Sequence, residues 1–189
     1  MLYNYAMAQS LTDIPRIYFP ASLDALTRFI SACVCVLMLC IAIATHNVFV
    51  IGLFVAVIAL SYAYSPKGYA ISEEDVVVQR LVGRVRIPLQ AILEIRRAES
   101  DDLKGCMRFF GNGGLFGYYG LYRTSKLGKC SWYVTDRGKG VILFTGTKTM
   151  VFSPDDAAGF ISALRAAASL PDTRMIRSVS DSKQANRRS

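Results

Sequence analysis

The stretch with the most candidate chemistry is the glycine-rich and aromatic run from Arg108 to Gly120, RFFGNGGLFGYYG. Glycines in such a run can cradle phosphates, so a nucleotide site is the first function to consider. A dinucleotide loop needs Gly-x-Gly-x-x-Gly opening a helix; Gly111 and Gly113 fit, but Phe116 occupies the last glycine position. The residues that follow are aromatic and typical of a strand, and the sequence has no Gly-Lys-Ser/Thr. We therefore expect no nucleotide and no other cofactor at this run.

The same run can instead be a packed connection or a contact surface. Its glycines allow close packing, and six aromatic residues lie between Phe109 and Tyr122, more than a connection needs. Between Leu103 and Lys139 there are seven basic residues and one acid, Asp136. Basic groups near an anionic leaflet favour binding by about 1 kcal/mol each. The candidate surface for an anionic lipid or a protein partner is Lys104, Arg108, Phe116, Tyr118, Tyr119, Arg123, Lys126 and Lys129.

Other catalytic or metal-binding patterns are absent from the sequence. The single histidine is His46, the five cysteines form no Cys-x-x-Cys pair, and there is no Gly-x-Ser-x-Gly. The acidic runs Glu73–Asp75 and Asp101–Asp102 are typical of solvated turns. We therefore expect a protein that is not an enzyme and has no metal site.

The element that must position any such surface is a stretch without charge, residues 29–66. As one helix it would be about 57 Å long, far more than a hydrocarbon core of about 30 Å. Thr45-His46-Asn47 is its most polar point and divides it into Phe29–Thr45 and Val48–Tyr64. Ser22 is the expected N-cap of the first helix, with Asp24 in its first turn. The sequence thus predicts a transmembrane hairpin, and a membrane anchor argues against nucleic-acid binding.

The flanking charges predict the orientation of this hairpin. Arg16 and Arg28 precede it and Lys67 follows it, whereas the turn at His46 has no Lys or Arg. By the positive-inside rule both termini are cytoplasmic, in a multi-pass protein of the cytoplasmic (inner) membrane. A signal peptide does not fit, because a polar 28-residue lead precedes the first span and a second span follows at once. One face of the second helix has small residues, which suit packing within the hairpin or between protomers: Gly52, Ala56, Ala59 and Ala63.

From Lys67 onward the pattern is that of short strands followed by one helix. The predicted strands are Gly68–Ser72, Val76–Val82, Arg84–Leu89, Ile92–Arg97, Ser131–Thr135, Val141–Thr145 and Lys148–Phe152. Their short connections predict antiparallel pairing. Ser153 is the expected N-cap of the helix, with Pro154 at its first position, and Ala157, Phe160, Ile161, Leu164 and Ala168 share its apolar face.

Four segments are considered together: Arg86–Leu89 with Ile92–Ile95, Arg108–Gly120, Tyr133–Asp136 and Ser153–Asp156. These segments resemble one family of bacterial membrane proteins that have two N-terminal spans and a pleckstrin-homology-like (PH-like) domain. The resemblance covers about residues 67–168 and implies an architecture without an established activity.

These observations predict an α+β membrane protein: an N-terminal two-helix hairpin, then a seven-stranded antiparallel barrel or sandwich capped by a C-terminal helix. The predicted divisions are an interfacial segment (1–21), the hairpin (22–65), the PH-like domain (66–169) and a disordered basic tail (170–189). The predicted function is a membrane-anchored scaffold or adaptor that presents a basic and aromatic surface at the cytoplasmic leaflet. The alternative is an accessory subunit of a larger membrane complex, or a homo-oligomer, associating through the hairpin.

Overall fold

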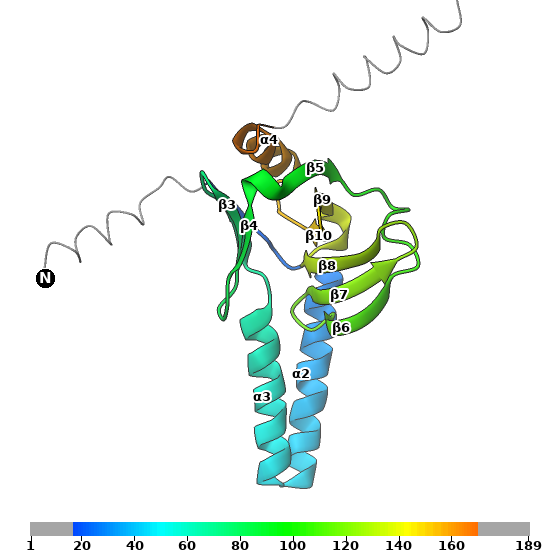
Figure 1. Cartoon of the computed structure of the whole chain (residues 1–189). Helices are drawn as coiled ribbons and strands as arrows, with labels where there is room; N and C mark the ends of the chain where they lie inside the picture. The colour runs from blue at the N-terminus through cyan, green and yellow to red at the C-terminus, as the bar shows by residue number, and fades with distance from the viewer. Residues whose placement is uncertain (1–16, 170–189) are drawn as a thin grey trace, which may run out of the picture.

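The computed structural model describes residues 17–169 and has an α+β architecture with two β-sheets. Helix α4 (Ala157–Ala167) packs on the strands, and two long apolar helices project from the same body (Figure 1). The predicted interfacial segment lies mostly outside the described residues, as does the predicted tail from residue 170 onward.

The two long helices lie where the sequence predicts helices. They are α2 (Ala25–Thr45) and α3 (Val48–Tyr64). His46 ends α2 in the left-handed conformation (φ 48°), and the Asn47 side chain caps α3 by accepting a hydrogen bond from Phe49 N at 2.9 Å. The cap of α2 is Asp24, whose carboxylate accepts from Thr27 N at 2.6 Å. The prediction of Ser22 as this cap is wrong, because its hydroxyl donates to Asp155 at 2.6 Å instead.

The helical hairpin is inserted between two paired strands. The first sheet has the order β1-β2-β3-β4, all antiparallel, with β1 (Ile17–Pro20), β2 (Gly68–Ile71), β3 (Asp75–Gln79) and β4 (Val85–Pro88). Pro20 pairs with Gly68, so the chain leaves the sheet for the hairpin and returns to the adjacent strand. Residues 17–20 belong to the predicted interfacial segment. They form β1, and Phe19 of this strand lies in the core, where it is 9% exposed.

The second sheet has six strands in the order β5-β9-β10-β8-β7-β6. Their bounds are β5 (Ile92–Arg97), β6 (Met107–Gly113), β7 (Tyr118–Thr124), β8 (Gly128–Val134), β9 (Val141–Thr145) and β10 (Thr149–Phe152). Short 3-10 turns, η1 (Leu89–Ala91) and η2 (Arg137–Lys139), precede β5 and β9. The prediction of antiparallel pairing throughout is wrong for β8 and β10, which are parallel. The connection from β8 to β9 is short, but β10 lies between these two strands in the sheet. A short connection therefore does not make the strands that it joins neighbours.

The seven predicted strands are all present with small changes of bounds, and the structure adds β1, β6 and β7. The glycine-rich run is therefore a β-hairpin, β6–β7, and not an irregular connection. Gly111 (φ 112°) pairs with Gly120 (φ 128°) across it. A Cβ at either position would collide with the backbone of the other strand, so the glycines permit the close approach.

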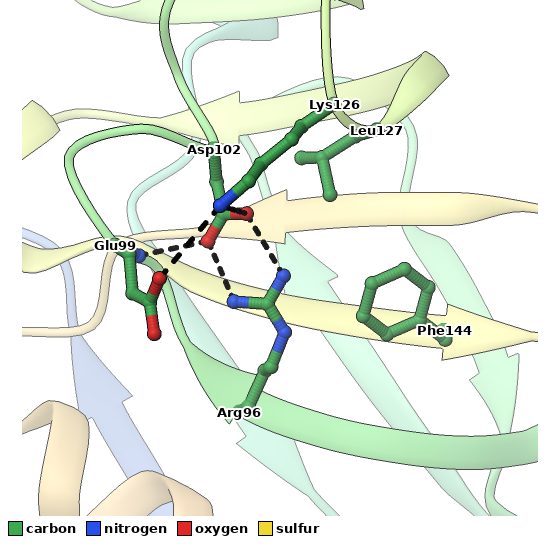
Figure 2. A pocket seen from close by; sticks show the side chains of 6 residues that line it. All are labelled: Arg96, Glu99, Asp102, Lys126, Leu127 and Phe144. Atoms are coloured by element: carbon green, nitrogen blue, oxygen red, sulfur yellow. Dashed lines mark hydrogen bonds and ion pairs between the residues drawn. The ribbon is translucent and has the colours of Figure 1, made fainter.

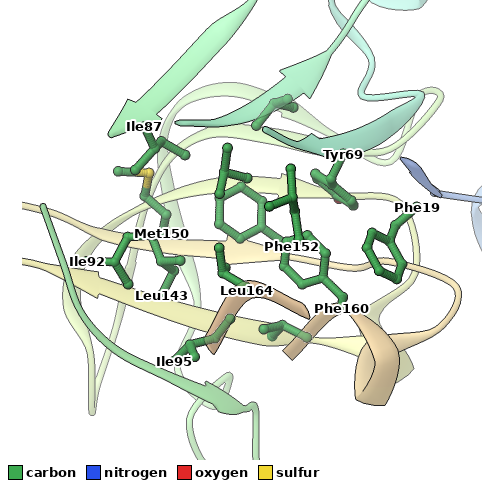
Figure 3. Packing of buried hydrophobic residues seen from close by; sticks show 14 of the residues in the cluster. Phe19, Tyr69, Ile87, Ile92, Ile95, Leu143, Met150, Phe152, Phe160 and Leu164 are labelled. Carbon is green, nitrogen blue, oxygen red and sulfur yellow. The ribbon is translucent and has the colours of Figure 1, made fainter. Parts of the chain in front are cut away.

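The main core lies between the two sheets and α4 (Figure 3). Phe160 of α4 packs edge-on against Phe19 at 5.2 Å between ring centroids, and Tyr69 packs edge-on against Phe152 at the same distance. The buried Tyr69 hydroxyl donates to Tyr133 O at 2.5 Å and accepts from Ser153 N at 3.0 Å. Burial raises the pKa of Tyr69, so the phenol stays neutral. Its two hydrogen bonds join the first sheet to the second.

Helix α4 is capped by Asp156, whose carboxylate accepts from Gly159 N at 2.8 Å. The prediction of Ser153 as the cap is wrong, because the buried Ser153 hydroxyl accepts from Thr135 N at 2.7 Å at the end of β8. The predicted apolar face is confirmed: Ala157, Phe160 and Leu164 are buried.

Candidate functional site

The β6–β7 turn holds the hairpin against the domain, with Phe116 at its centre. Phe116 N donates to the Ser31 hydroxyl of α2 at 2.9 Å, and Phe116 O accepts from the Ser65 hydroxyl after α3 at 2.5 Å. The Phe116 ring packs edge-on against Tyr62 of α3, with centroids 5.4 Å apart. Phe116 has a positive φ of 59°, a strained conformation for a non-glycine residue, which these contacts to both helices maintain. We call this set of contacts the hairpin junction.

The other predicted aromatic residues have structural partners as well. Tyr119 donates its hydroxyl to Ser61 O of α3 at 2.8 Å and so belongs to the hairpin junction. Tyr118 is 5% exposed, and the Arg137 guanidinium lies 4.3 Å from its ring centroid. The expectation that Phe116, Tyr118 and Tyr119 form an open contact surface is therefore not what the structure shows. Phe116 and Tyr119 contact the hairpin, and Tyr118 packs with Trp132 in a second, smaller cluster of buried residues.

The domain is further fixed to the start of α2 by Asp155. Its carboxylate accepts from Ser22 N at 3.1 Å, from the Ser22 hydroxyl, and from Lys139 Nζ at 2.8 Å. Burial favours the protonated acid, but the hydrogen bonds from Lys139 and Ser22 outweigh it and lower the pKa of Asp155. The hairpin is thus attached near both of its ends to the domain.

Two of the predicted basic residues are paired with acids at the far end of the second sheet. Lys104 Nζ lies 2.7 Å from Asp101, and Lys126 Nζ lies 3.8 Å from Glu99 and 3.9 Å from Asp102. Their charges are largely balanced locally, so they add little to a surface for anions.

Lys126 also lines a hollow of about 430 Å³ with Arg96, Glu99, Asp102, Leu127 and Phe144 (Figure 2). Arg96 donates two hydrogen bonds, at 2.6 and 3.0 Å, to the buried Asp102 carboxylate, and Glu99 N donates a third at 2.9 Å. These bonds, chiefly those from Arg96, lower the pKa of Asp102 to about 2. The two basic and two acidic side chains balance, so the hollow does not suit an anionic ligand.

The remaining predicted basic residues, Arg108 of β6, Arg123 of β7 and Lys129 of β8, are exposed. Met107 of β6 pairs with Arg123 of β7, which pairs with Lys129 of β8, and Arg108 follows Met107. Among residues 17–169, no acidic side chain lies within ion-pair distance of Arg108, Arg123 or Lys129. These three are the unbalanced part of the predicted basic surface.

Sequence reasoning missed the exposed apolar side chains of β6. Met107, Phe109 and Phe110 are 67%, 56% and 79% exposed. The sequence does contain a signal for a strand here: Met107–Phe110 has three apolar residues and one arginine, and Gly111 follows directly. The candidate site in the structure is therefore the edge strand β6 with Arg108, Arg123 and Lys129, positioned relative to the helices by the hairpin junction.

Comparison with known proteins gives one result for the PH-like part of the chain. The family model described as "Bacterial PH domain" matches residues 67–168, more than half of the sequence. No curated protein and no solved structure gives a significant match. The matched range covers β2 to α4 and leaves out β1 and the helical hairpin.

Proposed function

Because the chain belongs to the bacterial PH domain family, we propose that it is a membrane-anchored interaction module. Domains of this kind generally bind proteins or lipids, which supports a binding role and not a catalytic one. In this proposal α2 and α3 cross the cytoplasmic membrane, both termini are cytoplasmic, and the domain presents a basic and apolar surface at the inner leaflet.

One observation carries the proposal: two helices that are apolar on all sides project from the domain almost uncovered. α3 has no buried residue, and Phe49 and Leu53 are 84% and 61% exposed. α2 buries Thr27, Ser31 and Ala42, of which the first two lie at the domain end. A helix that is apolar all round needs a protein core or a bilayer to cover it.

The lengths of the helices support a bilayer. α2, with 21 residues, is long and apolar enough to cross a membrane. α3 has 17 residues, which is about 26 Å and the lower end of the range for a span. Arg28 and Lys67 lie at the domain ends of the helices, and the turn at His46-Asn47 has no Lys or Arg, which supports a cytoplasmic domain.

The experiment is to express the full chain with a reporter fused after Ser189 and to fractionate the cells. We expect reporter activity that reports a cytoplasmic location, and a protein that stays with the membranes in alkaline carbonate. A chain released by carbonate, or a reporter active only outside the cytoplasmic membrane, would contradict the proposal.

A second candidate function, an accessory subunit of a larger membrane complex, has one observation of its own. Gly52, Ala56 and Ala59 of α3 are exposed, whereas the half-buried residues of that helix are Val50, Phe54, Ile58, Ser61 and Ala63. Three of the four small residues thus lie away from the packing within the hairpin and can accept another helix. Native sizing in mild detergent tests this candidate, because a monomer in native membrane extracts would count against it.

A further inference from the structure

Two exposed tips of the domain lie on either side of the hairpin, and both point toward the side from which α2 and α3 project (Figure 1). One is the turn between β3 and β4, and the other is the edge strand β6. Each combines large apolar side chains with arginine.

The β3–β4 tip consists of Leu81, Val82 and Arg84. Leu81 and Val82 are 63% and 48% exposed, and Val82 N donates to Ala63 O in the last turn of α3 at 3.1 Å. This bond fixes the turn beside the domain end of the helix. Neither of these two apolar side chains belongs to the buried core clusters among residues 17–169.

The β6 tip consists of Met107, Arg108, Phe109 and Phe110. β6 ends at Gly113, directly before the turn that the hairpin junction binds, so the last residues of this strand lie beside the domain end of α2. It is the lowest strand of its sheet in Figure 1, on the side of the helices. The opposite edge of the same sheet is β5, which is drawn away from them.

Another strand is a poor occupant for the β6 edge. The pairing of β6 with β7 shifts register between Arg108 and Phe110, which leaves Phe109 as a bulged residue. Bulges and glycines with positive φ twist an edge away from further pairing, and proteins use them to prevent strand addition. The apolar side chains of β6 are therefore better suited to a fluid apolar phase than to a partner strand.

The charges favour an anionic leaflet. Arg84, Arg108, Arg123 and Lys129 are exposed, and among residues 17–169 none has an acid within ion-pair distance. Arginine beside apolar and aromatic groups is suited to the headgroup region, where the guanidinium meets phosphate and the ring enters the acyl boundary.

We propose that the domain rests on the cytoplasmic leaflet by these two tips, with Leu81, Val82, Met107, Phe109 and Phe110 in the interfacial region and the arginines on lipid phosphates. This proposal rests on the membrane anchor proposed above and names its lipid contacts. The hairpin and the two tips then form three points of support, which hold the rest of the domain in a fixed orientation to the membrane.

The test uses the full chain in vesicles of zwitterionic and anionic lipids whose acyl chains are brominated near the headgroup. Leu81→Trp and Phe110→Trp report on the tips, and Leu93→Trp is the matched control. Leu93 is 65% exposed on β5, at the opposite edge of the second sheet. Trp132 is 0% exposed and gives the same background in every variant.

We expect the added fluorescence of Leu81→Trp and Phe110→Trp to be quenched on the order of twofold more than that of Leu93→Trp, most strongly with anionic lipid. Charge reversal of Arg108 and Arg123 should reduce the quenching of Phe110→Trp, whereas reversal of the acid-paired Lys104 should not.

Quenching of both tips no greater than that of Leu93→Trp would overturn the proposal. So would an emission blue shift without bromine quenching that grows with protein concentration, which would indicate a second copy or another protein on β6. Flotation with the vesicles separates the two proposals. A chain that floats with unquenched tips refutes the tip contacts alone, and a chain that does not float refutes the membrane anchor as well.

Discussion

The pairing of Gly111 with Gly120 predicts that Gly120→Ala destabilises the domain strongly. Gly120 has φ 128°, and an added Cβ would lie 2.7 Å from Gly111 Cα. The positive φ costs about 1 to 3 kcal/mol for a non-glycine residue, and the backbone overlap adds about 1 to 3 kcal/mol. A total of about 3 kcal/mol lowers the Tm of a domain of this size by more than about 10 °C.

Thermal unfolding of the full chain in detergent micelles measures this change, followed by the fluorescence of Trp132. Trp132 pairs with Gly120 across β7 and β8, so it reports on the strand that is changed. The matched control is Gly146→Ala, where no atom lies within 4 Å of the added Cβ and φ is not in the left-handed region. We expect this control to melt at or slightly above the wild-type temperature.

If Gly120→Ala melts within about 2 °C of the wild type, the two glycines do not face each other across a hairpin. The geometry of β6 would then be wrong, and with it the position of the apolar residues assigned to the β6 tip.

Two further predictions concern the ion pair and the hairpin junction. The pKa of Asp102, lowered from 3.8 to about 2, makes the ionised carboxylate a stabilising group above about pH 4, and about 2 kcal/mol of that stability is lost as the pH falls toward 2. Acid titration of unfolding should show this loss in the wild type and not in Asp102→Asn; equal slopes would contradict it. Ser31→Ala leaves the Phe116 N–H without its acceptor and should cost about 1 to 3 kcal/mol, whereas Ser162→Ala on the exposed face of α4 should cost less than about 0.5 kcal/mol. Equal effects in denaturant titrations would argue against the hairpin junction.

The helices and most strands could be predicted because their signals are local. A charge-free run with a polar break at His46-Asn47 indicates two helices, and Ile92–Arg97 and Val141–Thr145 have the composition of strands with turn residues nearby. The bounds of these two strands agree with the structure. Local patterns of this kind depend little on the remainder of the chain.

The features that the sequence did not predict depend on distant partners. Ser153 and Asp156 can both cap α4, and the choice follows from Thr135 N, which requires the Ser153 hydroxyl. β1 has four residues and forms because β2 lies beside it and Phe19 fills a place against α4. The glycines in β6 and β7 lower the strand propensity of both segments, so neither reads as a strand by itself. The two segments form strands because they pair with each other.

The candidate surface was only partly predicted, because it too depends on contacts between residues that are distant in the sequence. The sequence indicates that the region around Arg108 is basic and aromatic, but it does not show which side chains are already engaged. In the structure Phe116 and Tyr119 bind the hairpin, Lys104 and Lys126 bind acids, and the exposed apolar residues are those of β6.

The most direct test of the membrane anchor is the labelling of two single cysteines in intact bacterial cells with a membrane-impermeant maleimide. His46→Cys at the hairpin turn and Thr147→Cys in the exposed β9–β10 turn are introduced into a chain whose five cysteines are replaced by alanine. We expect His46→Cys to react in intact cells and Thr147→Cys to react only after the cytoplasmic membrane is opened. Labelling of Thr147→Cys in intact cells, or protection of both positions until that membrane is opened, would contradict a hairpin that crosses the membrane with its domain inside.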